Sequence, residues 1–92
     1  MTLMLNGFSS NGVTITSLNN FEQPLNDIPL TYNLFKEDKK MGEVTIKLKN
    51  NELIITQVMP EEGIEEMNFK KELEVLLNAF KKINSIGDII FL

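Results

Sequence analysis

The chain contains no cysteine and no histidine. The first absence excludes disulfide bonds, thiolate metal sites and cysteine nucleophiles. The second excludes imidazole bases and the histidine ligands of the common zinc sites. A Ser-His-Asp triad therefore cannot form, and the composition assigns no metal, no cofactor and no catalytic residue.

Arginine is also absent, so lysine supplies all nine basic residues, and the net charge is -4. Proteins that bind nucleic acids usually carry a basic patch and use arginine for bidentate contacts to phosphates and bases. Direct nucleic-acid binding is therefore disfavoured. Abundant Asn, Ile, Lys and Glu without Arg indicate an AT-rich coding genome, such as that of a low-GC bacterium or its phage.

Long apolar runs are missing as well. No segment approaches the ~20 apolar residues that span a bilayer, and the apolar segment 1–5 lacks the basic region of a signal peptide. Hydrophobic residues make up 42% of the chain and charged residues 24%, as in ordinary globular proteins. We therefore expect residues 1–92 to form one domain, cytoplasmic in a bacterial host, with no membrane partner.

One segment has strong helical periodicity. Its large apolar residues recur at steps of four and three: Phe69, Leu73, Leu76, Phe80 and Ile83. This spacing predicts one apolar stripe along a helix covering residues 64–84. Asn68 is a candidate N-cap, with an earlier turn over 64–67 left open. Gly87 is the expected left-handed residue after the helix.

Most of the remaining chain has the alternating pattern of strands. Segments 2–6 and 13–18 are interpreted as a hairpin whose loop, 7–12, is framed by glycines. Segment 30–36 is a predicted strand, and 37–42 is a predicted charged turn with Gly42 as its permissive residue. Segment 43–49 alternates most cleanly, and its apolar side predicts a core-facing row: Val44, Ile46 and Leu48.

Asn50-Asn51 predicts a two-residue type I′ turn, because Asn tolerates left-handed geometry. The turn sets Lys49 opposite Glu52, Leu48 opposite Leu53 and Ile46 opposite Ile55, with a one-residue slip as the open alternative. The strand that follows, 52–58, is apolar on both faces. Leu53 and Ile55 are expected on one face, and Ile54 and Val58 on the other. The second face then needs another layer or another subunit to cover it.

Segment 88–92 ends in four large apolar residues. We interpret it as a last strand docked in the sheet, with an exposed partner anchor as the alternative. The predicted fold is α+β: a mostly antiparallel sheet of about five to six strands, with one amphipathic helix packed on one face.

The longest stretch without a predicted element is 19–29, which contains two prolines and four Asn or Asp residues. Phe21, Leu25 and Ile28 are expected to pin this loop to the domain. Phe21 here, and Phe8 in the 7–12 loop, are also candidate partner contacts, because aromatic residues are enriched in interface hot spots. For Phe8 the favoured interpretation is that it caps the core.

The densest charged feature is a group of four carboxylates within six residues: Glu61, Glu62, Glu65 and Glu66. A solvated acidic helix start accounts for them. Two alternatives stay open: a site for a hard cation, although the spacing is not that of an EF-hand, and an acidic patch for a basic or nucleic-acid-binding protein. We take these four as candidate partner-binding residues.

No P-loop, G-x-G-x-x-G or G-x-S-x-G motif is present, and no spacing brings two other carboxylates together for acid–base work. The sequence therefore favours a small, acidic, non-enzymatic protein-binding module. An inhibitor or immunity-type protein of phage or mobile-element origin, directed at a host or defence protein, is the main hypothesis. The alternative is a structural or assembly subunit, such as a phage-particle component or another homo-oligomer.

Overall fold

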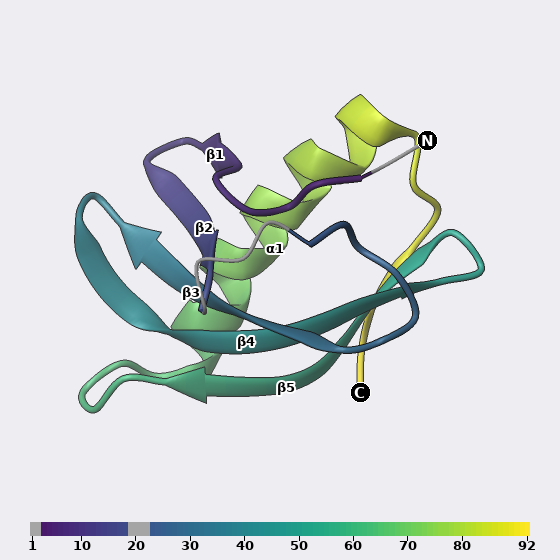
Figure 1. Ribbon diagram of the computed structural model, residues 1–92. Coiled ribbons are helices and arrows are strands. Elements are labelled where there is room, and N and C mark those ends of the chain that lie inside the picture. Colours follow the sequence, from purple (N-terminus) through teal and green to yellow (C-terminus); the bar gives the residue numbers. More distant parts are fainter. Residues whose placement is uncertain (1–2, 19–22) are drawn as a thin grey trace.

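The computed structural model of the chain describes residues 3–18 and 23–92. In this part of the chain six strands form one sheet and one helix packs against it (Figure 1). The strands lie in sequence order, and all neighbours are antiparallel except β5 and β6. The predicted α+β class is confirmed. The elements are β1 Ser9–Ser10, β2 Val13–Ser17, β3 Leu30–Lys36, β4 Lys39–Lys49, β5 Glu52–Pro60, α1 Glu66–Asn84 and β6 Ile89–Phe91.

The sheet curls around α1. β1 and β2 lie at one end of the strand order and β6 at the other, yet all three approach α1, as β5 does. Six strands laid flat would be about 24 Å wide, whereas a helix with its side chains is about 10–12 Å across. The curvature therefore lets one helix cover the inner face of the whole sheet.

The core fills the space between α1 and the concave face of the sheet. Leu5, which precedes β1, and Ile86, which follows α1, also belong to this core. The core-facing row predicted for segment 43–49 is confirmed at Val44 and Ile46, while Leu48 is half-buried at the margin. The buried side chains are Leu5, Val13, Ile15, Leu25, Tyr32, Leu34, Met41, Val44, Ile46, Leu53, Ile55, Phe69, Leu73, Leu76, Leu77, Phe80 and Ile86.

The helical stripe is confirmed at four of its five positions. Phe69, Leu73, Leu76 and Phe80 are buried, but Ile83 is 71% exposed and the prediction for it is wrong. At 3.6 residues per turn, Ile83 lies about 80° around the helix from Leu73, whereas Leu77 lies only about 40° away. Leu77 is accordingly buried in its place.

Three two-residue turns connect the hairpins, and in each both central residues have positive φ, as type I′ turns require. The Asn50-Asn51 turn (φ 54° and 61°) and its predicted pairing are confirmed. Glu37-Asp38 (φ 47° and 69°) forms a second such turn. Because that turn is so tight, β4 begins at Lys39, and the prediction of a turn extending to Gly42 is wrong.

The predicted pairing of segments 2–6 and 13–18 is also wrong within the described residues. The strand paired with β2 is β1, inside the expected loop, and residues 3–5 belong to no strand. The third type I′ turn, Asn11-Gly12 (φ 53° and 81°), closes this hairpin early. Residues 3–8 instead cross the end of the core: Leu5 is fully buried, and the ring of Phe8 packs edge-on against Phe80 at 5.1 Å.

A bulge in β5 changes the predicted faces of that strand. Thr45 pairs with Gln57 and the next residue, Ile46, pairs with Ile55, so Thr56 is the extra residue. A bulge reverses the in–out alternation beyond it. Val58 therefore lies opposite the core residue Val44 and packs against the core, not on the outer face with Ile54. Strand β5 is consequently less apolar on its outer face than the sequence predicts.

Both ends of α1 differ from the predicted caps. The N-cap position is Glu65, not Asn68, so the earlier turn left open by the sequence is partly present. At the other end Ser85 (φ 55°), not Gly87, takes the left-handed conformation, and the Ile86 N–H donates to the Lys81 carbonyl. Gly87 is needed for a different reason: a Cβ there would lie 3.0 Å from the carbonyl oxygen of Asn51.

Residues 23–29 contain no helix or strand, as predicted. Leu25 pins the segment by burying its side chain and donating its N–H to the Leu3 carbonyl at 2.8 Å. Ile28 is 65% exposed, so the prediction that it also pins the loop is wrong. Phe21 lies outside the described residues.

Replacing Leu76 with Ala should lower the free energy of unfolding by ~2–5 kcal/mol, because it leaves a cavity under a fully buried side chain. Val75→Ala is the matched control, since Val75 is 41% exposed on the same helix turn, and should change stability by less than about 0.5 kcal/mol. Chemical denaturation measures both. A wild-type denaturation midpoint for Leu76→Ala would contradict the packing of α1.

Replacing Gly42 with Ala should destabilise the fold by about 1–3 kcal/mol through overpacking. The new Cβ would overlap the backbone carbonyl oxygen of Met59, and it would lie 2.8 Å from Cε2 of Phe69 and 2.8 Å from Cα of Pro60. Phe69→Leu removes part of the obstacle, so the double variant should lose less stability than the two single variants summed. Strict additivity in denaturant titrations would show that the Phe69 ring adds nothing to the cost, which would then come from the backbone of Met59 and Pro60 alone.

Candidate functional site

The acidic segment is a tight turn between β5 and α1. The Glu61 N–H donates to the Met41 carbonyl at 2.8 Å and so continues the β4–β5 ladder. The Ile64 N–H then donates back to the Glu61 carbonyl at 3.0 Å, and Gly63 has φ 86°. Glycine with positive φ at the third position is the signature of a type II turn. Ile64 packs against the core, so the segment has a defined shape. We call residues 61–66 the acidic turn.

The four predicted partner-binding carboxylates all lie on the acidic turn, and all four residues are exposed. Glu66 pairs with Lys70 one helical turn later, with Oε2 3.3 Å from Nζ. Among the described residues, Glu61, Glu62 and Glu65 form no ion pair and accept no side-chain hydrogen bond. The acidic turn therefore presents three fully hydrated carboxylates to solvent.

The start of α1 favours this concentration of negative charge. The first backbone N–H groups of a helix lack intrahelical partners and carry partial positive charge. Glu65 occupies the N-cap without a side-chain capping bond, and Glu66 lies in the first turn. Local electrostatics thus accounts for these two carboxylates, but not for Glu61 and Glu62, which precede the helix.

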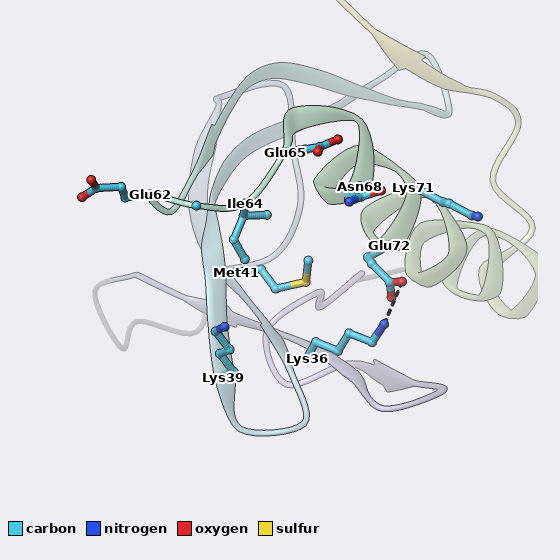
Figure 2. Close-up of a pocket in the computed structure, with 10 residues that line it drawn as sticks. Lys36, Lys39, Met41, Glu62, Ile64, Glu65, Asn68, Lys71 and Glu72 are labelled. Carbon is cyan, nitrogen blue, oxygen red and sulfur yellow. Dashed lines mark hydrogen bonds and ion pairs between the residues drawn. The ribbon is translucent and has the colours of Figure 1, made fainter.

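Beside the acidic turn lies an open cleft of about 570 Å³ between α1 and the ends of β3 and β4. The side chains of Met41 and Ile64 both line it (Figure 2). Lys36 on β3 reaches across to Glu72 on α1, with Nζ 3.0 Å from Oε1. The lining residues are Lys36, Lys39, Met41, Glu62, Gly63, Ile64, Glu65, Asn68, Lys71 and Glu72.

The charged groups around the cleft do not converge on a common point. In Figure 2 the side chains of Glu62 and Lys71 point away from the cleft on opposite sides. Within the described residues, no group of three or more Asp or Glu side chains is arranged to hold a metal ion. The geometry of the described residues therefore gives no support to the hard-cation interpretation of the acidic turn.

The outer face of the sheet is predominantly polar. The Thr31 and Thr45 hydroxyls form a hydrogen bond at 3.0 Å, and Lys40 pairs with Glu43 at 3.0 Å. Its apolar residues are half-buried Ile54 and Ile90, which are neighbours at the β5–β6 border, together with half-buried Phe35 on β3 and Met59 on β5, which is 41% exposed.

The two aromatic candidates are not near the acidic turn as far as the structure describes them. Phe8 is half-buried against Phe80 in the second half of α1, which supports its interpretation as a cap on the core. Phe21 lies outside the described residues. The cleft was missed by sequence reasoning, because Lys36 and Glu72 meet only through the packing of β3 against α1.

No family model, curated protein or solved structure matches the chain. Within the described residues, no helix combines the length and apolar character needed to cross a membrane.

The buried titratable group that the structure contains is Tyr32, the sole tyrosine of the sequence. It is 1% exposed, and its hydroxyl has no hydrogen-bond partner among the described residues. Burial raises the pKa of Tyr32 to about 12 from the ordinary value of 10.0, because the phenolate loses its hydration. Tyr32 belongs to the core and forms no part of the cleft lining.

The absorbance change of phenolate should therefore appear near pH 12 in the folded protein, rather than near 10. Because the pKa of Tyr32 is higher in the folded state, the unfolded state loses this proton first. The stability that the protonated Tyr32 hydroxyl allows is fully present below pH 10, and it is lost as the pH rises toward 12. The difference in unfolding free energy between wild type and Tyr32→Phe should shift in favour of the variant over this range. A phenolate midpoint at 10 in the native protein would contradict the burial of the hydroxyl.

Proposed function

We propose that this chain is a small, acidic, non-enzymatic protein-binding module that contacts a basic surface of its partner through the acidic turn. The observation that carries the proposal is the presentation of Glu61, Glu62 and Glu65, without ion-pair partners among the described residues, on a turn with its own hydrogen bonds. A preorganised group of like charges attracts a complementary surface and loses little conformational entropy when it binds.

The net charge of -4 acts in the same direction. A negative field accelerates the approach of a basic protein and hinders the approach of an acidic one. Proteins that bind nucleic acids carry basic surfaces, so they are the partner class that an acidic turn fits best. Within this class we favour an inhibitor or immunity-type role in a bacterial cytoplasm, on the compositional indication of a phage or mobile-element origin.

The test compares two variants of equal net charge. In the first, Glu61, Glu62 and Glu65 are replaced with Gln, which leaves the Glu66–Lys70 pair intact. In the matched control, three exposed carboxylates elsewhere are neutralised: Asp27→Asn, Glu37→Gln and Asp38→Asn. Wild type and both variants are immobilised and exposed to lysate of a low-GC bacterium. Retained proteins are identified by mass spectrometry at stepwise salt concentrations.

We expect wild type and control to retain the same basic protein and to release it as salt increases, because salt screens exposed charges. The acidic-turn variant should bind that protein about tenfold or more weakly, a loss of about 1.4 kcal/mol or more. Equal retention by the two variants would remove the acidic turn from the binding surface. Reversal of all four glutamates to Lys should abolish retention.

A further inference from the structure

β6 is the last strand of the sheet, and only β5 borders it among the described residues. The Asp88 carbonyl accepts a hydrogen bond from the Leu53 N–H at 2.9 Å, and the Leu92 N–H donates to the Ile55 carbonyl at 3.0 Å. In a strand, alternate residues direct their backbone groups to opposite sides. Residues 88, 90 and 92 therefore face β5, and the N–H and C=O groups of Ile89 and Phe91 face the open side.

This edge lacks lysine, proline and a bulge, three of the features that usually prevent strands from pairing there, although β6 has only three residues. The opposite edge, β1, has only two residues and both are serine. By contrast Ile89, Ile90 and Phe91 are all apolar and half-buried, and Leu92 beyond them is 79% exposed. The open side of β6 therefore has backbone N–H and C=O groups exposed to water between large apolar side chains.

We propose that β6 pairs with β6 of a second copy of this chain, antiparallel and about a two-fold axis, so that the two sheets become one. The backbone directions determine the register. In antiparallel strands the residues that exchange both hydrogen bonds must each face the partner. Ile89 of one copy therefore lies opposite Phe91 of the other, and the axis passes between the two Ile90 residues. This arrangement forms four hydrogen bonds from groups that are otherwise open to solvent.

The side chains suit this self-pairing. Ile89 and Phe91 lie on the helix side of the sheet, in register with the core residues Leu53 and Ile55. Across the axis they form pairs of a β-branched and an aromatic residue, which stabilise antiparallel sheets. The two Ile90 residues meet on the outer face. No charged residue lies within the paired segment 89–91.

Charge along the border of α1 selects a second copy over an unrelated strand. Lys70 lies with its ammonium 5.8 Å from the ring centre of Phe91, and Glu74 follows one helical turn later on the same side. Ile90 lies one strand residue, or about 3.3 Å, before Phe91. Along α1, which runs antiparallel to β6, the same distance corresponds to about two residues after Lys70. The axis through Ile90 thus falls about midway between Lys70 and Glu74, and it sets each of them against the opposite charge on the second copy. Lys70 also pairs with Glu66 of the acidic turn, with Nζ 3.3 Å from Oε2, so a contact with Glu74 of the second copy would compete with that pair.

The experiment measures solution mass by light scattering during size exclusion, from micromolar to millimolar protein, for wild type and two variants. Phe91→Pro removes an N–H that faces the open side and leaves the bonds to β5 intact. Ile83→Lys is the control, because Ile83 is an exposed apolar residue on α1 that faces away from β6. We expect wild type and Ile83→Lys to become dimeric as concentration rises, and Phe91→Pro to remain a monomer at least tenfold higher in concentration.

Amide hydrogen exchange of unsubstituted protein provides a second readout that does not depend on how a variant folds. In dilute monomer the Ile89 and Phe91 amides should exchange much faster than those of Ile90 and Leu92, and at dimer-forming concentrations all four should be protected. A dimer in which Ile89 and Phe91 still exchange rapidly would overturn the proposal. A wild type that stays monomeric at millimolar concentration would also overturn it, and would leave this edge free for a strand of a different protein.

Swapping the two charges tests the proposed pairing of Lys70 with Glu74 of the second copy. Lys70→Glu and Glu74→Lys should each weaken dimerisation, and the double variant should restore it toward wild type. Failure of the double variant to recover would contradict the proposed register.

Discussion

One helix has to cover the inner face of a six-stranded sheet, and the rest of the structure follows from that constraint. The stripe of α1 supplies five buried side chains, led by Phe69 and Leu73. A stripe of that width cannot cover a flat sheet, so the strands curl until both ends of the sheet approach the helix. At Gly42 the sheet and helix approach closely, because a Cβ there would meet both the Met59 carbonyl oxygen on β5 and the ring of Phe69 on α1.

The same helix places the two surfaces to which we assign roles. Helix α1 connects the end of β5 to the start of the parallel strand β6. The first residues of α1 and its last residues therefore lie at opposite ends of the strands. The entry to α1 is the acidic turn, which follows the last hydrogen bond of the β4–β5 ladder and carries Glu62 and Glu65 on either side of Ile64 (Figure 2). The exit delivers β6 to the outermost position of the sheet (Figure 1). The two surfaces meet only at Lys70, which pairs with Glu66 and lies over Phe91, so pairing through β6 would leave Glu61, Glu62 and Glu65 of both copies exposed. Two acidic turns on one dimer would also increase the effective concentration of contacts with a partner that has repeated basic sites.

Much of the fold could be predicted from local sequence. The alternation of Val44 and Ile46, the Asn50-Asn51 turn and the stripe of α1 each depend on contacts within a few residues or on a single periodicity. The errors arose where two local rules compete. Asn11-Gly12 closes the first hairpin before segment 2–6 can pair, and Thr56 interrupts an alternation that the sequence shows as continuous. The acidic turn could be located by composition alone, but its neighbouring cleft could not, because that depends on β3 meeting α1.

The sequence by itself determined the class of the fold, the one helix, the acidic turn and the chemistries that missing residue types exclude. These properties follow from composition and from periods of two and 3.6 residues, which are local. Tertiary structure alone decided which edge of the sheet is open, and it decided that Val58 points inward and that Ile83 is exposed. The physical reason is that a side chain's burial depends on what the rest of the chain brings next to it. The curl of the sheet around α1 determines that environment, and no local pattern in the sequence encodes the curl.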